Sequence, residues 1–365
     1  VASIQQDLLT LGGRVYMTNI TLGSSPPKPY TLVIDTGSSD TWIASSAFQC
    51  LSKYTQKPLS QSACGFGDLY DEGESESWEG IPSHGFEVRY TDGEFLSGDL
   101  GIENLEIGGL TTRQTIGVVD SGWWIGDNIS SGLMGLAYPI LTSGHQDLNY
   151  TSVVFSLFED GDVPPIFSLA LSRPSATSSI TGGLLALGGI PDIPYSGAFV
   201  TVPIRPIMST TYAFYSVPVD GFAIAPPPAA RGTTRPKIAN FAKQATEMTI
   251  DSGTTLIYFP DTVADYVAGL FNPPAMYNKL SNLYIVNCSS KAPRIGVIIA
   301  GQKFFVNEKD LLNGGAVASR KGWCVLAIQR QGQGDAVLGD AFLKNVVAVF
   351  DVGENEMMFA AREKY

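Results

Sequence analysis

The sequence predicts an all-β protein built from two related lobes. Short runs of β-branched and aromatic residues, bounded by glycine, proline, asparagine or aspartate, recur along the whole chain, whereas helical patterns are few and short. Two short motifs also occur once in each half, in the same order. The length of 365 residues is enough for two domains, at roughly 150 residues for each domain.

The predicted strands cover both halves of the chain. They are Val15–Leu22, Tyr30–Ile34, Phe86–Tyr90, Thr112–Val119, Ile166–Leu171, Leu184–Leu187, Phe199–Ile204, Phe214–Val219, Met248–Ile250, Tyr284–Val286, Gly296–Ala300 and Val346–Phe350. The clearest helix is Asp261–Phe271, which follows Pro260 and ends before Asn272-Pro273. Weaker helical patterns occupy Asn149–Phe158 and Ala341–Asn345.

The internal duplication divides the chain. Tyr30–Ser39 (YTLVIDTGSS) is echoed by Glu247–Thr255 (EMTIDSGTT), and Ser131–Ala137 (SGLMGLA) is echoed by Ala336–Ala341 (AVLGDA). A Gly/Pro-rich run ends at Tyr195, so we expect an N-terminal lobe over residues 1–195 and a C-terminal lobe over residues 196–365. Each lobe would then contribute one acidic loop.

Charge and hydropathy exclude several function classes. The formal net charge of −12 and the sequence pI near 4.6 argue against nucleic acid as a partner, because phosphate backbones repel an acidic protein. The same charge suits an acidic medium. The longest apolar runs are far shorter than the roughly 18 residues that a membrane span needs, so no membrane span is predicted.

Cysteines and sequons indicate a secretory route. The four cysteines allow three pairings, of which we favour the local ones, Cys50–Cys64 and Cys288–Cys324. With no CxxC pair and only two histidines, we expect neither a metal site nor a cofactor. The candidate glycosylation sites are Asn19, Asn128, Asn149 and Asn287. The chain begins at Val1 without Met, which fits removal of a leader and a pro-segment from a zymogen.

The chemistry is expected at the two acidic loops. Asp35 directly follows a strand of buried type, where an ionised carboxylate is costly unless it is hydrogen-bonded or paired. Asp251 occupies the same position in the second copy. Two carboxyl groups at hydrogen-bonding distance share one proton, so one can accept a proton from water while the other protonates a carbonyl oxygen. This pattern predicts attack of water on an amide without a metal.

These motifs resemble those of the pepsin-type aspartic proteases over nearly the whole chain. The runs that start at Asp35 (DTGSS, with Trp42) and Asp251 (DSGTT) match the two catalytic loops of that family. Two apolar-apolar-Gly runs, Leu133-Met134-Gly135 and Val337-Leu338-Gly339, match the segments beneath those loops. Leu184–Gly189 matches the end of the first lobe. Tyr90–Gly93 resembles the hairpin flap that closes over substrate, although Thr91 stands where the flap usually has glycine.

The resemblance implies a role for each matching residue. Asp35 and Asp251 are expected to hold the attacking water. Gly37 and Gly253 would donate their N–H groups to the inner carboxylate oxygens, and Ser38 and Thr254 would donate their hydroxyls to the outer oxygens. Thr36 and Ser252 would interlock beneath the pair. These supporting residues are Thr36, Gly37, Ser38, Ser252, Gly253 and Thr254. The expected flap and substrate-binding residues are Tyr90, Thr91, Asp92, Gly93, Trp42 and Val33, with Trp42 bonded to Tyr90.

Two segments look inserted, and we expect both to be surface loops. Asp68–Glu79 is strongly acidic, whereas Ala223–Lys243 is rich in proline and alanine and carries basic residues.

We therefore expect a secreted, monomeric acid endopeptidase that cleaves polypeptides at hydrophobic residues and binds pepstatin-type inhibitors. Two alternatives remain open. A yapsin-like processing protease would cleave beside basic residues, for which the acidic segment could supply carboxylates. A catalytically inactive relative would only bind polypeptides in the cleft.

Overall fold

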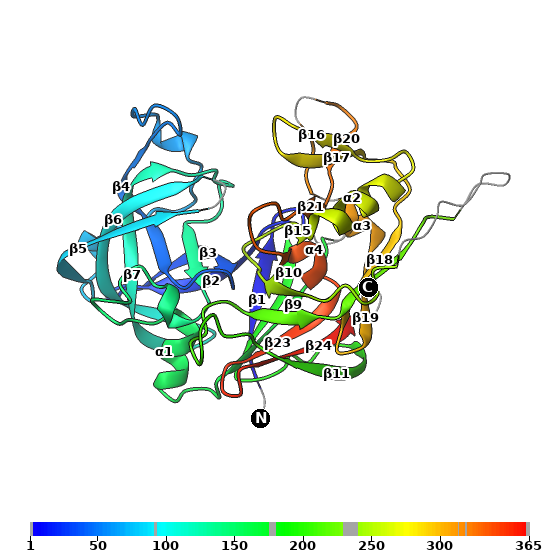
Figure 1. Cartoon of the computed structure of the whole chain (residues 1–365). Helices are drawn as coiled ribbons and strands as arrows, with labels where there is room; N and C mark the ends of the chain where they lie inside the picture. Colours follow the sequence, from blue (N-terminus) through cyan, green and yellow to red (C-terminus); the bar gives the residue numbers. More distant parts are fainter. Residues whose placement is uncertain are drawn as a thin grey trace.

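The computed structural model describes residues 3–90, 93–174, 180–228, 240–312, 314–317 and 320–362 (Figure 1). The described chain is dominated by strands and has four short α-helices, α1 (Val153–Glu159), α2 (Asp261–Leu270), α3 (Glu308–Leu311) and α4 (Asp340–Leu343). The strands of the first half are β1 (Ile4–Thr10), β2 (Tyr16–Leu22), β3 (Lys28–Asp35), β4 (Thr41–Cys50), β5 (Glu79–Arg89), β6 (Phe95–Ile107), β7 (Leu110–Trp123), β8 (Gly132–Gly135), β9 (Ile166–Leu171) and β10 (Thr181–Leu187).

The strands of the second half are shorter on average and form several sheets. They are β11 (Tyr195–Pro203), β12 (Ser216–Val219), β13 (Gly221–Ala225), β14 (Thr246–Ile250), β15 (Ile257–Phe259), β16 (Met276–Asn278), β17 (Leu283–Asn287), β18 (Arg294–Ile299), β19 (Gln302–Val306), β20 (Trp323–Val325), β21 (Ile328–Arg330), β22 (Val337–Leu338), β23 (Val346–Asp351) and β24 (Glu356–Arg362).

The predicted all-β, two-lobed class is confirmed. Figure 1 shows β3 to β7 on one side and α2 with β15 to β21 on the other. A 13-stranded sheet runs in the order β11-β24-β23-β9-β10-β1-β2-β3-β8-β4-β7-β6-β5 and so joins strands from both ends of the chain. β11 starts at Tyr195, where we placed the boundary between lobes, and pairs with β24.

The duplication in sequence is a duplication in topology. In the first half β3 lies parallel to β8, β8 lies antiparallel to β4, and β4 lies parallel to β7. In the second half β14, β22, β15 and β21 repeat this order and these directions. The strand that leads to each acidic loop therefore has the same neighbour in both halves.

Each predicted strand and helix overlaps an observed one, but several strands were not predicted. β6 contains Gly98 and Gly101, which are usually signs of a turn. A Cβ on Gly98 would lie 2.0 Å from the carbonyl oxygen of Val118, so glycine here permits close approach of β6 and β7. The predicted loop over residues 223–243 is wrong at its start, since Ala223 to Ala225 pair with β18. Residues 229–239 lie outside the described chain.

The core is made of two clusters of buried hydrophobic side chains. The larger extends through both halves, from Leu8 to Phe359. The smaller is confined to the first half and includes Trp42, Phe48 and Phe86. Both expected disulfides are present, Cys50–Cys64 beside the smaller cluster and Cys288–Cys324 between β17 and β20. Within the described residues, no helix is long and apolar enough to cross a membrane.

Candidate active site

The two acidic residues stand at the ends of equivalent strands. Asp35 is the last residue of β3 and pairs with Gly135 of β8, and its carbonyl oxygen accepts a hydrogen bond from the N–H of Leu136. Asp251 follows β14, and its N–H donates to the carbonyl oxygen of Leu338 at 3.2 Å. Parallel pairing of β3 with β8 and of β14 with β22 thus fixes the backbone of Asp35 and Asp251.

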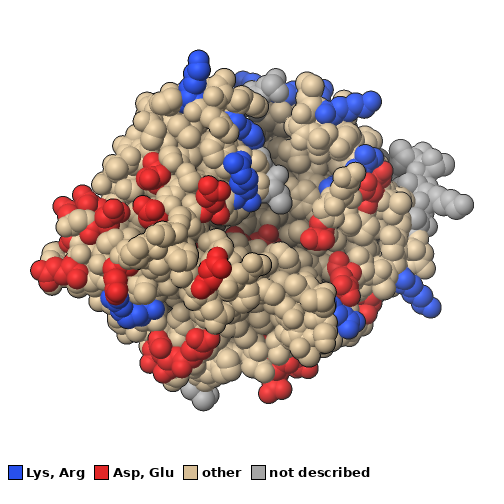
Figure 2. Space-filling model, turned by 60° about the vertical axis from the view of Figure 1, so that its left-hand side comes forward, with Lys and Arg blue, Asp and Glu red and all other residues tan. Residues whose placement is uncertain are grey.

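The two acidic loops lie directly against each other. A Cβ on Gly37 would lie 2.7 Å from Cγ of Asp251, and a Cβ on Gly253 would lie 2.3 Å from Oδ1 of Asp35. Real Cβ atoms essentially never approach other heavy atoms this closely, so only glycine fits at either position. Each glycine makes room for the carboxyl group of the opposite loop. Figure 2 shows a hollow near the centre of one face, with acidic side chains on its floor.

Each carboxyl group accepts two hydrogen bonds from its own loop. The N–H of Gly37 donates to Oδ1 of Asp35 at 2.7 Å, and the Ser38 hydroxyl donates to Oδ2 of Asp35. In the second loop the N–H of Gly253 donates to Oδ1 of Asp251 at 2.8 Å, and the Thr254 hydroxyl donates to Oδ2 at 2.5 Å. The structure therefore gives the glycines and hydroxyls the contacts expected of them. These bonds hold both carboxyl groups in fixed orientations.

The middle residues of the two loops form four hydrogen bonds between the lobes. The Thr36 hydroxyl donates to the carbonyl oxygen of Ile250 at 2.9 Å and accepts from the N–H of Ser252 at 2.9 Å. The Ser252 hydroxyl donates to the carbonyl oxygen of Ile34 at 3.0 Å and accepts from the N–H of Thr36 at 3.1 Å. Both side chains are buried. This reciprocal pattern sets the distance between the two carboxyl groups.

Burial and the neighbouring acid control the ionisation of Asp35. The side chain is buried, which raises the pKa of Asp35 by desolvation, and the charge of Asp251 raises it further. The hydrogen bonds from Ser38 and Gly37 lower the same pKa but do not cancel the increase.

Two further buried acids flank the site, and sequence reasoning missed both. Asp340 follows Gly339 under the second loop, and its carboxyl oxygens have no hydrogen-bond partner among the described residues. Burial raises the pKa of Asp340 well above the ordinary value, although the positive charge of Lys344 opposes this. Asp40 ends the first loop and accepts hydrogen bonds from the Tyr150 hydroxyl and from the N–H of Ser143 at 3.0 Å. Burial also raises the pKa of Asp40.

The flap hairpin packs on an aromatic cluster beside the first loop. The buried Trp42 Nε1–H donates to the Tyr90 hydroxyl at 2.8 Å, as expected, and the Tyr90 ring lies edge-on to Trp124 with ring centroids 5.7 Å apart. The turn is closed by bonds from the N–H of Gly93 to the Tyr90 carbonyl oxygen and from the N–H of Tyr90 to the Glu94 carbonyl oxygen. Val33, two residues before Asp35, is partly buried against the same cluster. Thr91 and Asp92 lie outside the described residues.

The remaining predicted positions lie away from the acidic loops in sequence. Asn19, Asn128 and Asn149 are exposed, whereas Asn287 is half-buried and its side-chain oxygen accepts from the hydroxyl of Ser289 at 2.7 Å. Within the described ranges, no three His, Cys, Asp or Glu side chains are grouped as metal ligands would be.

Comparison with known proteins places the chain in a family. The sequence model of the eukaryotic aspartyl proteases matches residues 15–362. A probable aspartic-type endopeptidase of Aspergillus fumigatus is 39% identical over 359 residues, which cover 95% of this chain and 78% of that protein. An aspartic protease of Phaffia rhodozyma is 31% identical over 352 residues, covering 93% of this chain and 75% of that protein. Candidapepsin-3 of Candida albicans is 28% identical over 354 residues, covering 94% and 79%.

The chain therefore belongs to the eukaryotic aspartyl proteases, enzymes that hydrolyse peptide bonds. The resemblance to pepsin-type proteases is confirmed. A further relative, 27% identical over 354 residues that cover 94% of this chain and 79% of that protein, is named a secreted aspartic protease of Candida albicans.

Proposed function

We propose that this chain is an acid endopeptidase that activates a water molecule between Asp35 and Asp251. The observation that carries the proposal is the mutual fit of Gly37 and Gly253 to the opposite carboxyl groups, which brings the two acids into one site. Fixed hydrogen bonds from both loops leave the carboxyl groups little freedom to reorient.

The reaction needs one proton on the pair. The ionised carboxyl group takes a proton from water as the water oxygen bonds to the peptide carbonyl carbon, and the protonated group donates its proton to the carbonyl oxygen. Collapse of the tetrahedral intermediate breaks the C–N bond: the amine nitrogen takes a proton from one carboxyl group, while a hydroxyl of the intermediate returns a proton to the other, so the pair again holds one proton. The reaction stops when both carboxyl groups are ionised, so activity should peak below neutral pH.

The flap and its surroundings support binding of an extended polypeptide. A flap over the cleft can add main-chain hydrogen bonds to a substrate strand. Phe66 and Trp124, which are partly exposed and pack on the buried Trp42, offer apolar surface near Tyr90, which supports a preference for hydrophobic residues next to the cleaved bond. We also propose that the protein acts as a secreted monomer and binds pepstatin-type inhibitors.

Cleavage beside basic residues has less support. That alternative needs the acidic segment at the cleft, but Glu74 of this segment pairs with Lys28 at the start of β3. Asp35 is the last residue of the same strand, about 23 Å away at roughly 3.3 Å per residue. Glu74 is therefore far from the proposed site of cleavage.

The test is digestion of casein and of a quenched fluorescent peptide between pH 2 and pH 7, with and without pepstatin. We expect cleavage that pepstatin blocks, and loss of at least about 10³-fold in kcat for Asp35→Asn and for Asp251→Asn with retained thermal stability. Substantial activity in either variant would show that the mechanism is wrong. Absence of any cleavage by the unmodified protein would favour the binding-only alternative.

A further inference from the structure

Arg14 projects from a tight turn beside the second acidic loop. The turn joins β1 to β2 through Gly12 and Gly13, which have φ of +64° and +69°, and the N–H of Arg14 donates to the Leu11 carbonyl oxygen. Two consecutive residues with positive φ match the twist of a two-residue hairpin, and glycine adopts them without strain. The turn therefore presents Arg14 from a defined backbone.

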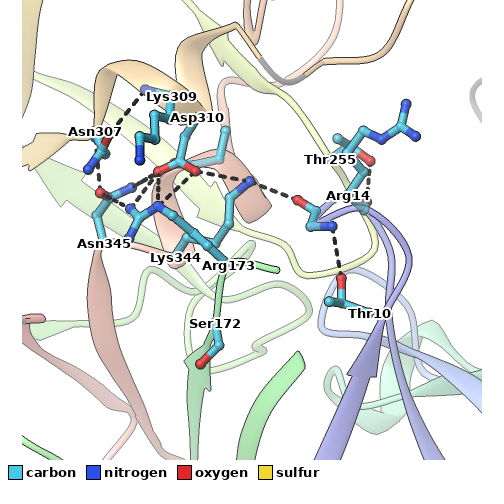
Figure 3. A network of polar contacts seen from close by, with 12 residues as sticks. Thr10, Arg14, Ser172, Arg173, Thr255, Asn307, Lys309, Asp310, Lys344 and Asn345 are labelled. Carbon is cyan, nitrogen blue, oxygen red and sulfur yellow. Dashed lines mark hydrogen bonds and ion pairs between the residues drawn. The ribbon is translucent and has the colours of Figure 1, made fainter. Parts of the chain in front are cut away.

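The backbone around Arg14 is anchored to the C-terminal lobe (Figure 3). The Gly13 carbonyl oxygen accepts from Nζ of Lys344 at 2.7 Å, and Lys344 is buried and pairs with Asp310 at 3.3 Å. The Thr255 hydroxyl donates to the carbonyl oxygen of Arg14 at 2.5 Å. Because Thr255 is four residues after Asp251, this bond attaches the turn directly to the second acidic loop.

The guanidinium takes no part in that network. Figure 3 shows the Arg14 side chain pointing away from Lys344 and Asp310. A Cβ on Gly315 would lie 2.8 Å from Nη1 of Arg14, so the group rests against the loop that starts at Gly314. The side chain is half-buried and forms no ion pair with any residue that the structure describes. Among the residues that the structure describes, the guanidinium is therefore held against the loop at Gly315 without a carboxylate partner.

The position suits contact with a bound polypeptide. Four residues span at most about 14 Å, so Thr255, and with it the backbone of Arg14, lies within that distance of Asp251. An extended substrate advances about 3.3 Å per residue, so a residue three or four positions from the cleaved bond lies at a comparable distance from Asp251.

We propose that Arg14 determines specificity by binding the carboxylate of an acidic substrate residue three or four positions from the cleaved bond. This inference rests on the proposed function and adds an acidic flanking residue to its hydrophobic preference. Guanidinium and carboxylate form paired, charge-assisted hydrogen bonds, and a cation at the margin of the cleft also attracts acidic segments before binding.

A second cation, Lys53, lies near the flap. Nζ of Lys53 lies 4.3 Å from the centre of the Trp123 ring and 3.1 Å from where a Cβ on Gly93 would stand, so its charge is held beside the flap turn. Figure 2 shows Lys and Arg side chains along one margin of the hollow, with acidic side chains among them.

The test compares quenched peptides with one hydrophobic core that carry Glu, Gln or Lys at each position from two to five residues on either side of the cleaved bond, at pH 5.5. We expect kcat/KM to be about three- to tenfold higher for Glu than for Gln at one or two positions, with Lys below Gln. Arg14→Ala should reduce the Glu-to-Gln ratio to about one, and Arg14→Glu should invert it.

The matched control is Arg113→Glu, which changes the net charge as Arg14→Glu does. Arg113 pairs with Glu79 at the acidic segment, so the Glu-to-Gln ratio should stay at the wild-type value. If Arg14→Glu does not fold, Arg14→Gln gives the same comparison without added charge. An unchanged ratio in Arg14→Ala or Arg14→Gln would overturn this inference while leaving the proposed function intact. If the unmodified protein cleaves no peptide, the proposed function fails and this inference fails with it.

Discussion

Replacement of Gly253 by alanine is expected to separate the two carboxyl groups. The added Cβ would lie 2.3 Å from Oδ1 of Asp35, whereas ordinary contacts begin at 3.4 Å, so the carboxyl group must move. A displacement of about 1 Å at the reacting groups costs about 10²-fold in rate, which corresponds to about 2.7 kcal/mol in the activation free energy. The φ of Gly253 is not in the left-handed region, so the backbone itself accepts alanine.

The assay measures kcat and KM on one quenched hydrophobic peptide, together with the thermal unfolding temperature. We expect kcat to fall about 10²-fold with little change in KM, because the rest of the cleft is unaltered. Gly269→Ala in α2 is the control, since nothing lies within 4 Å of the added Cβ. That variant should keep full activity and gain about 0.5–1 kcal/mol in the free energy of unfolding. Wild-type kcat in Gly253→Ala would refute the close apposition of the two loops.

Two further variants test the hydrogen bonds and the buried acid that surround the pair. Ser252→Ala removes both bonds of its hydroxyl to the first loop and should lower the free energy of unfolding in urea by about 2 kcal/mol, whereas Ser281→Ala on the exposed surface should not. The folded-state pKa of Asp340 is raised, so the contribution of this carboxyl group to the free energy of unfolding is fully present below its unfolded-state pKa of about 3.9. That contribution is lost as the pH rises through the folded-state pKa. The unfolding temperature should therefore fall from pH 4 toward pH 8, and fall less steeply in Asp340→Asn; equal slopes would show that Asp340 does not titrate between those values.

Sequence reasoning predicted two related lobes because the duplication is local and repeated. The two Asp-x-Gly runs and the two apolar-apolar-Gly runs recur in order, and in the structure they form matching parallel pairs. Glycine does not always mark a turn in this chain, however. Gly98 lies inside β6, where the sequence suggests a break, because the reason for glycine is the approach of a strand from elsewhere.

The surroundings of the site were beyond sequence reasoning for a different reason. Asp40 meets Tyr150 across more than a hundred residues, and Arg14 meets Gly315 across three hundred. No local pattern encodes such contacts, because each depends on how separate loops pack in three dimensions. In the acidic segment the charge is visible in sequence, but the distance of Glu74 from Asp35 follows only from the pairing of Glu74 with Lys28.

The most direct test of the shared proton is the pH dependence of kcat/KM between pH 2 and pH 8 on a substrate that carries no ionisable side chain. We predict a bell with its maximum below neutral pH, limited on the alkaline side by loss of the single proton held between residues 35 and 251. A rate that rises to a plateau at pH 7 or above would contradict the account, because a fully ionised pair has no proton to give to the carbonyl oxygen.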